Sequence, residues 1–274
     1  MVKKRSKKLD FPIEHWSYSS LMSYLRNPLA WHKRYVENIR DTPSKPSGVV
    51  GRAGHKALEH FYSSVPKEHA IEQGLKYLRD IPDFEIDFGK ATTKAAQKKK
   101  RALMEREYLQ AIGFYLERPP RHKVVGVEIA GLAPVEDLPL PVKAISDLVV
   151  ESRIEKGALD IVDHKFVDSF SALKGDKTLF VLQALFNYYT VKEAYGLPVR
   201  RFIVQECKKR KNKDGKSQMR RYIIDFAELE EEFGVFYRLL FDATLDLATR
   251  KIFLPNPSDM FEGENSFDIY RLGL

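Results

Sequence analysis

Three charged residues in two apolar segments have the types and spacing of a metal-assisted hydrolytic site. Asp147 stands in the middle of VKAISDLVV, where its charge is costly unless another group compensates for it. The next such segment, ALDIVDHKF, carries Asp163 and Lys165, which the period of two of a β-strand places on one face, with His164 on the other. If the two segments are neighbouring strands, both acids can bind one hard cation, while Lys165 polarises a phosphate or orients water. This is the equipment of phosphodiester hydrolysis.

The D-x-K pattern of Asp163 and Lys165 also has a simpler explanation. In an arbitrary strand, such a pair is more often a surface ion pair on an edge strand. Two further residues favour chemistry: His55 on an expected helix before these strands, and Gln183 at the start of an expected helix after them. The order of these elements favours a catalytic site over a surface ion pair.

The helix that is expected to carry His55 runs from Val49 to about Tyr62, where apolar residues recur at helical spacing. His55 and Glu59 are four residues apart and therefore share a face of this helix. A helical histidine is often held by its neighbours in a core. Gly51 and Gly54 favour metal ligation instead, because small residues let a helix approach a site closely.

The rest of the sequence predicts the elements that position these residues. Three Val- and Ile-rich segments after the breaker ERPPR predict a meander of strands, and the Asp214-Gly215 pair predicts a later hairpin. The helix that carries Gln183 can act as a crossover between strands, which implies an α/β fold with a central mixed sheet flanked by helices. The expected strands span 124–130, 142–150, 158–166, 201–207 and 220–226, and the expected helices about 18–35, divided or kinked at Pro28, then 49–62, 94–116, 177–195 and 228–250.

We expect one catalytic domain in this chain of 274 residues. Residues 1–12 form an expected basic, flexible tail, and residues 13–274 the domain. Within the domain we expect a helical part at about 13–118, a catalytic sheet core at about 122–226, and a C-terminal helix and tail at 228–274.

Composition excludes several classes of site. Cys207 is the only cysteine, which rules out an intrachain disulfide, a cysteine-based zinc site and a cysteine-ligated iron–sulfur cluster, so a metal must use oxygen or imidazole ligands. No apolar run approaches the roughly 20 residues that span a bilayer, and MVKKRSKKLD is not a secretory signal. We therefore expect a cytoplasmic protein without a membrane partner. The net charge of +8 supports a polyanionic partner only weakly.

Two basic clusters could follow the phosphates of a nucleic acid. They are Lys98, Lys99, Lys100 and Arg101 on the long helix, and Lys208, Lys209, Arg210, Lys211, Lys213, Lys216, Arg220 and Arg221 around the hairpin. The alternative is that charge runs are solvated faces, and that lysines at hairpin tips protect sheet edges. Tyr188 could stack on an unpaired base, although its helical spacing suits core packing better.

The series GRAGHKALE, then SD within a strand, then VDHK, then Gln183 resembles the RecB-like, CRISPR-associated-exonuclease-like nucleases of the PD-(D/E)XK superfamily. The resemblance covers about Tyr18 to Tyr270 and implies a restriction-endonuclease-like core with N-terminal and C-terminal helical elaborations. Asn27-Pro28 stands where the family has a Cys-Pro pair, and LPNPSDMFEGENSFDIY resembles a C-terminal stretch that bears three further cysteines in many members. These cysteines hold an iron–sulfur cluster that this chain lacks. We expect packing of Trp31 with Phe261 or Phe267 to join the terminal parts instead.

The resemblance also implies roles for individual residues. His55, Asp147, Asp163 and the backbone carbonyl of His164 would bind Mg²⁺ or Mn²⁺. Lys165 would face the phosphate or orient water, and Gln183 would position the substrate or Lys165. Glu59 and Glu128 match acids that could orient the metal ligands. Asn187 stands where the family usually has a tyrosine, with Tyr188 and Tyr189 after it.

The expected function is therefore that of a DNA nuclease that hydrolyses phosphodiester bonds with metal-activated water. By resemblance, it is an exonuclease of DNA recombination, repair or replication, with a helicase or recombinase as a partner and a bacterial or phage origin. The site residues contact phosphate and not base or sugar, so they leave RNA and a structure-selective endonuclease open as alternatives. A non-catalytic nucleic-acid-binding factor is a further alternative.

Overall fold

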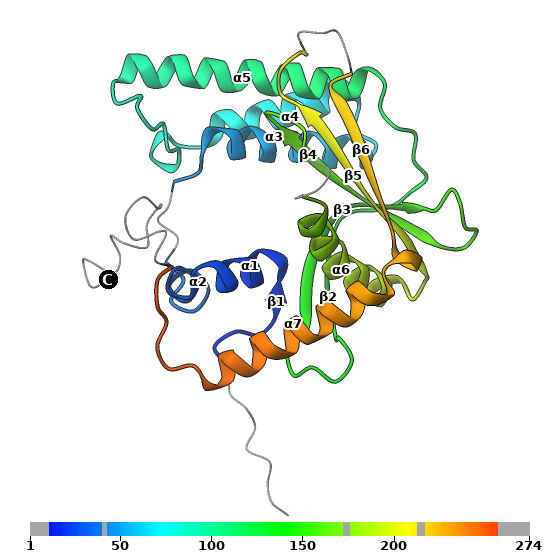
Figure 1. Cartoon of the computed structure of the whole chain (residues 1–274). Helices are drawn as coiled ribbons and strands as arrows, with labels where there is room; N and C mark the ends of the chain where they lie inside the picture. Colours follow the sequence, from blue (N-terminus) through cyan, green and yellow to red (C-terminus); the bar gives the residue numbers. More distant parts are fainter. Residues whose placement is uncertain (1–10, 40–42, 172–175, 213–216, 257–274) are drawn as a thin grey trace, which may run out of the picture.

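A mixed β-sheet forms the centre of the computed structural model, which describes residues 11–39, 43–171, 176–212 and 217–256 (Figure 1). Its strands are β1 (Trp16–Ser17), β2 (Val124–Ala133), β3 (Val142–Glu151), β4 (Leu159–Val167), β5 (Val199–Lys208) and β6 (Met219–Asp225). The order is β1-β3-β4-β5-β6, and β2 also pairs with β3. β1 with β3 and β4 with β5 are parallel, whereas the other pairs are antiparallel. The α/β class with a mixed sheet is confirmed.

The strand connections follow the sequence-based expectations. β2, β3 and β4 form the antiparallel meander, and α6 (Asp176–Tyr195) crosses over between the parallel strands β4 and β5. β5 and β6 pair as a hairpin, whose expected Asp214-Gly215 turn lies outside the described residues. The sheet interior therefore contains both segments that carry the acids.

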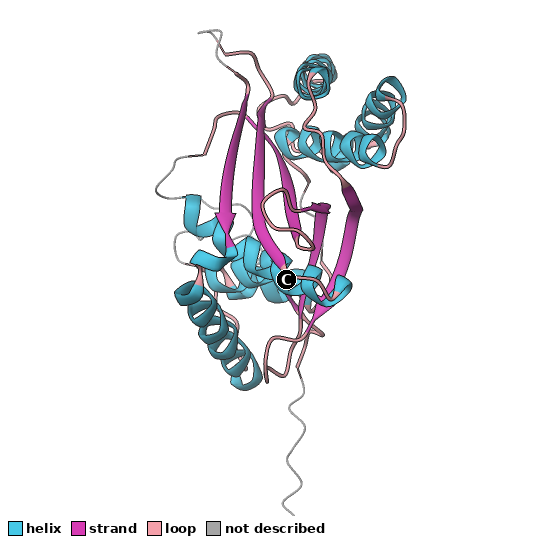
Figure 2. Ribbon diagram, turned by 90° about the vertical axis from the view of Figure 1, so that its right-hand side faces the viewer, coloured by secondary structure: helices cyan, strands magenta, loops and turns pink. Residues whose placement is uncertain are grey.

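Helices lie on both sides of the sheet (Figure 2). On one side lie α3 (Pro46–Tyr62), α4 (Lys67–Asp80) and α5 (Lys94–Glu117) (Figure 1). On the other side lie α6 and α7 (Glu230–Thr249), with α1 (Tyr18–Arg26) and α2 (Pro28–Tyr35) nearby. Asn27 caps α2 and separates it from α1, so Pro28 divides the first expected helix. α4 was not among the expected helices. Short 3-10 turns lie at Asp83–Glu85 and Phe226–Glu228.

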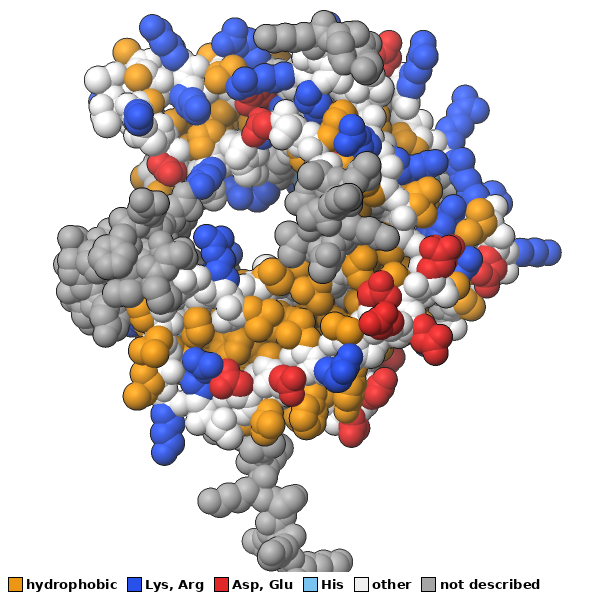
Figure 3. All heavy atoms as spheres, in the orientation of Figure 1, with side chains coloured by type: hydrophobic (Ala, Val, Ile, Leu, Met, Phe, Trp, Pro, Cys, Tyr) orange, Lys and Arg blue, Asp and Glu red, His pale blue; other side chains and the backbone are white. Residues whose placement is uncertain are grey.

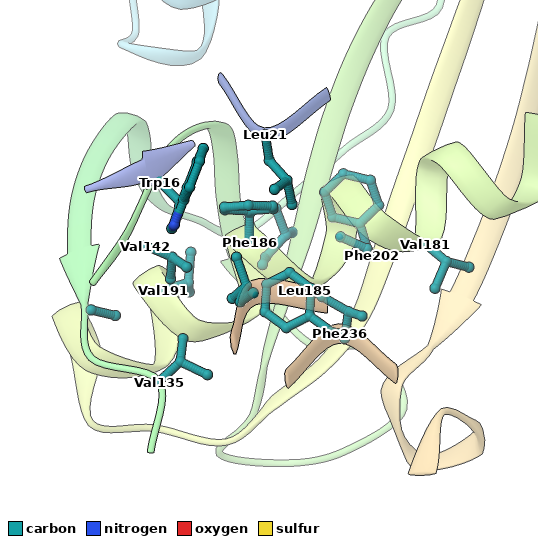
Figure 4. Packing of buried hydrophobic residues seen from close by; sticks show 14 of the residues in the cluster. Trp16, Leu21, Val135, Val142, Val181, Leu185, Phe186, Val191, Phe202 and Phe236 are labelled. Atoms are coloured by element: carbon teal, nitrogen blue, oxygen red, sulfur yellow. The ribbon is translucent and has the colours of Figure 1, made fainter. Parts of the chain in front are cut away.

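Successive side chains of a strand point to opposite faces of the sheet, and an apolar core lies on each face. On β5, Phe202 and Val204 belong to the core under α6 and α7, whereas Cys207 packs with α3, α4 and α5. The first core also contains Trp16, Phe186 and Phe236 (Figure 4). Both faces are covered, which accounts for the continuous apolar runs in β3 and β4.

The segment after α7 returns to the N-terminal helices. Leu29 N–H donates to the carbonyl oxygen of Leu254 at 3.2 Å, and the ring of Phe253 lies 5.8 Å from that of Trp31. Trp31 thus takes part in the expected packing, but with Phe253; Phe261 and Phe267 lie outside the described residues. No helix in the described ranges is long and apolar enough to cross a membrane.

Candidate active site

The two acids meet where β3 and β4 separate. The paired residues of these strands end at Leu148 and Val162, so Asp147 and Asp163 are the next residues outward on each strand. Beyond that point, the backbone N–H of His164 donates to Asp147 Oδ2 at 2.7 Å. Both strands are interior, and Asp163 is only 7% exposed. The alternative of a surface ion pair on an edge strand is therefore wrong.

Asp163, Lys165 and Gln183 form a closed set of polar contacts. Lys165 Nζ lies 2.8 Å from Asp163 Oδ2 and donates to Gln183 Oε1 at 3.1 Å. Gln183 Nε2 in turn donates to Asp163 Oδ1 at 2.7 Å. Gln183 lies in the middle of α6 and not at its start, so this contact spans from helix to sheet. An ammonium group has three N–H donors, so these contacts leave one for a phosphate oxygen.

A second set of side chains can hold a cation. His55 Nδ1 lies 3.3 Å from Asp147 Oδ2, and one ligand atom each of His55, Glu128 and Asp147 lies within 4.8 Å of the others. Carboxylate oxygens and an imidazole suit a divalent ion such as Mg²⁺ or Mn²⁺. The arrangement brings Glu128 into the ligand set, where the sequence suggested only an orienting role. The ligand roles of His55, Asp147, Asp163 and the His164 carbonyl all stay predictions.

Glu128 has an unusual backbone conformation. It lies between the pairs Val127–Leu148 and Ile129–Ser146, and so opposite Asp147 on the neighbouring strand. Its φ is +51°, a left-handed value that L residues rarely adopt within a strand. Such a conformation costs about 1–3 kcal/mol and persists only where the surroundings enforce it. The fold therefore stores strain at the residue that aims a carboxylate at Asp147.

Burial and neighbouring charges shift the pKa values of the acids and the histidine at this site. Burial, and after it the neighbouring Asp147 charge, raises the pKa of Glu128 to about 7. Burial also raises the pKa of Asp163, against the opposing effect of Lys165. Burial lowers the pKa of His55, but the carboxylates of Asp147, Asp163 and Glu128 together outweigh this effect and bring the value to about 9. His55 is thus a cation at neutral pH, and a bound metal ion would replace its proton.

Glycine allows the helix of His55 to approach the sheet. A Cβ on Gly54 would lie 2.3 Å from the Phe166 ring of β4, closer than real Cβ atoms come. The ring of His55 lies 6.1 Å from the same phenylalanine. Gly54 therefore sets the distance between α3 and β4, and with it the position of His55.

Gly54→Ala should lower the free energy of unfolding by about 1–3 kcal/mol, because the added methyl group displaces Phe166 or α3. Gly51→Ala is the matched control on the same helix, where nothing lies within 4 Å of the new Cβ. It should stabilise by up to about 1 kcal/mol through helix propensity. Urea unfolding measures both, and equal stabilities of the two variants would contradict this account of the α3–β4 contact.

Glu59 and His164, two other candidate residues, lie beside the cluster of His55, Glu128 and Asp147. Glu59 pairs with Lys56 at 2.9 Å. The imidazole of His164 stacks on Tyr62, with ring centroids 5.7 Å apart. These positions agree with an orienting role for Glu59, which stays a prediction.

Asn187 occupies the position where the sequence departs from the family's tyrosine. It is buried, accepts from Ser146 Oγ at 2.7 Å and donates to the Gln183 carbonyl at 2.9 Å. Ser146 precedes Asp147 on β3. Asn187 therefore ties α6 to the strand that carries the first acid.

Several proposed phosphate contacts have structural partners instead. Arg101 donates to the carbonyls of Leu78 and Ile81, and Lys209 is 1% exposed and lies 3.1 Å from Asp168. Arg210 pairs with Glu107, although it is exposed. Burial removes Lys209 from the set of plausible phosphate ligands, whereas Arg101 is half-buried and its guanidinium is engaged by backbone carbonyls and by Asp83.

The other proposed contacts differ in their exposure. Lys98 and Lys99 are exposed, Lys100 is half-buried, and all three lie on α5, above α3 and α4 in Figure 1. Lys211 is exposed three residues after the end of β5. Tyr188 packs against Phe226 and Phe233, which suits the core-packing alternative. Lys208 and Arg220 flank Phe170, a residue that the sequence did not single out.

Comparisons with known proteins give matches that cover most of the chain. A family model described as the PD-(D/E)XK nuclease superfamily matches residues 15–258. Among solved structures, the chain is similar to one described as "Crystal structure of SSO0001", with 14% sequence identity, 83% of this chain and 84% of that chain covered, and a TM-score of 0.31. No curated protein matches the sequence.

Proposed function

We propose that this chain, which belongs to the PD-(D/E)XK nuclease superfamily, is a divalent-metal-dependent DNA nuclease that hydrolyses phosphodiester bonds. One observation carries the proposal. The cluster of His55, Glu128 and Asp147 adjoins the contact set of Asp163, Lys165 and Gln183, at the point where β3 and β4 separate. This arrangement supports the proposal, because three residues that could bind a metal ion lie next to a lysine that could bind phosphate.

The residues divide the chemistry between them. A divalent cation, when bound, supplies a Lewis acid for the phosphate and lowers the pKa of water. His55, Asp147 and Glu128 would hold it, and Asp163 lies beside them. Lys165 donates a hydrogen bond to a phosphate oxygen and stabilises the charge that develops there. Gln183 fixes the directions of both Lys165 and Asp163 through its amide.

The surface around α3 agrees with a polyanionic substrate. Figure 3 shows a hollow in one face of the molecule, between the layer of α3–α5 and the layer of α1 and α7, with lysine and arginine side chains on its rim. α3, which carries His55, borders this hollow (Figure 1). Cations around a concave surface raise the local concentration of an anionic substrate.

The finer parts of the proposal come from the resemblance to RecB-like nucleases. They are exonuclease action, a role in DNA recombination, repair or replication, and a helicase or recombinase partner. The intact set of Asp147, Asp163 and Lys165 argues against a non-catalytic factor, since a binding protein does not need two acids beside a lysine.

End-labelled substrates test the mode of cleavage. Single- and double-stranded DNA and RNA of one sequence, labelled at the 5′ or the 3′ end, would be incubated with Mg²⁺, Mn²⁺ or EDTA. We expect metal-dependent cleavage of DNA from one end. The label at that end should appear in very short products, whereas a label at the opposite end should remain on a strand that shortens progressively. Internal fragments from both labels would indicate an endonuclease, and no cleavage with any substrate would overturn the proposal.

A further inference from the structure

We infer that a row of aromatic and basic side chains beside Lys165 is a binding platform for single-stranded nucleic acid. This row, the cation–aromatic strip, consists in order of Phe180, Tyr222, Arg220, Phe170 and Lys208. The inference rests on the proposed nuclease function and goes beyond it, because it names the form of the substrate and the residues that hold it.

The strip is continuous from the catalytic lysine outward. Lys165 Nζ lies 5.6 Å from the centre of the Phe180 ring, and that ring lies 5.7 Å from the ring of Tyr222. Arg220 donates to the Tyr222 hydroxyl at 3.4 Å.

The same arginine begins the second half of the strip. The guanidinium of Arg220 lies over the ring of Phe170 at 4.5 Å, and Lys208 Nζ lies 5.6 Å from the same ring. Aromatic rings and cations therefore lie in contact along one path from the active site to β5 and β6.

Buried charged groups hold the segment that carries Phe170. Glu206 is 0% exposed, and its carboxylate accepts from the backbone N–H of Ser171 at 3.0 Å and from the Ser171 hydroxyl. Before Phe170 in the sequence, Asp168 pairs with the buried Lys209, and the backbone N–H of Lys209 donates to the Val167 carbonyl at 2.9 Å. A buried charge is costly unless it is fully paired. Glu206 and Lys209 are two such buried charges, and they fix the segment that directly follows β4. A segment held in this way suits a binding surface that must keep its shape.

The chemistry of the strip fits an unpaired strand better than a duplex. Phe170, Phe180 and Tyr222 are half-buried, so each ring keeps an accessible part, and Arg220 is exposed. Bases of a single strand can stack on such rings, while the cations neutralise the phosphates between them. In a duplex, the base faces are already stacked on one another and only the phosphates remain for Arg220 and Lys208.

Phe170→Ala tests the strip through binding, measured by fluorescence anisotropy in EDTA, so that cleavage does not interfere. The probes are a fluorescein-labelled oligothymidylate and a hairpin duplex with the same number of phosphates. We expect the substitution to weaken binding of the single strand by about tenfold or more, and binding of the duplex by no more than about twofold.

Companion variants separate stacking from packing and from folding. Phe170→Trp should keep the affinity for the single strand, whereas Phe170→Leu, which retains apolar bulk without a ring, should lose it as alanine does. Phe84→Ala is the matched control, since Phe84 is 81% exposed on the 3-10 turn between α4 and α5. Arg220→Ala should make the slope of log affinity against log salt concentration shallower by about one, whereas Arg238→Ala on α7 should leave this slope unchanged.

The outcomes distinguish this inference from the proposed function. If wild type cleaves DNA but Phe170→Ala and Phe170→Leu bind the single strand as well as wild type does, the strip is overturned and the nuclease stands. Equal weakening for strand and duplex would likewise overturn the stacking platform. If wild type neither binds nor cleaves any nucleic acid, the function and the strip both fail.

Discussion

Asp163→Asn is expected to lower metal-dependent cleavage of DNA by at least about 1,000-fold, which is about 4 kcal/mol of transition-state stabilisation. The variant removes a carboxylate that contacts Lys165 and Gln183 and lies next to Asp147. The loss of stability should be small, because burial disfavours the charge of Asp163 and an asparagine oxygen can still accept from Gln183. Lys165 loses its anion but keeps its contact with Gln183 and is more exposed than Arg201. Single-turnover kinetics and thermal unfolding of the same sample measure the two effects.

Asp160→Asn provides the matched control on the same strand. Asp160 is 1% exposed, like Asp163 a buried acid of β4, but it pairs with Arg201 and not with the site. Removing its charge leaves Arg201 partly buried without its anion, so the thermal midpoint should fall while the activity per folded molecule is kept. If Asp163→Asn lost stability and kept activity, Asp163 would be a structural acid and the assignment would be wrong.

Lys165→Met should lower cleavage by about 100- to 1,000-fold while the affinity for Mn²⁺ is kept or rises. The substitution removes the cation that would contact the phosphate, and it also removes a positive charge 2.8 Å from Asp163 Oδ2 that repels a metal ion. Isothermal titration with Mn²⁺ gives the affinity, and single-turnover cleavage at saturating metal gives the chemical rate.

Lys143→Met is the control for this second prediction, since Lys143 is exposed on β3, four residues before Asp147. Its removal should change neither quantity. A parallel loss of metal affinity and cleavage in Lys165→Met would show that Lys165 maintains the shape of the metal site, and would contradict its role at the phosphate.

The sequence predicted that Asp147, Asp163 and Lys165 lie close together because the physical signals of these residues are local. An aspartate inside a run of β-branched residues is visible without a structure, and the period of two places Asp163 and Lys165 on one face. The order of strands and the crossover helix followed from apolar periodicity. The meander then required the strands of Asp147 and Asp163 to be neighbours.

Other features depend on contacts between distant residues and leave no local signal. The position of Glu128 beside His55 and Asp147 depends on its place between two paired residues of β2 and on a left-handed φ, which nothing in VVGVEIA indicates. The basic runs looked alike in the sequence, yet Lys209 is buried against Asp168 while Arg220 covers Phe170. A charge run shows the number of cations and not which of them have partners.

The most direct test of the account is a titration of wild type with Mn²⁺, in which metal binding and DNA cleavage are measured on the same sample and compared with Asp147→Asn. We expect cleavage to rise in proportion to the occupancy of the site, to cease in EDTA, and to disappear together with tight metal binding in the variant. Cleavage that persists in EDTA, or metal binding that is unchanged in Asp147→Asn, would contradict a metal-dependent active site at His55, Glu128 and Asp147.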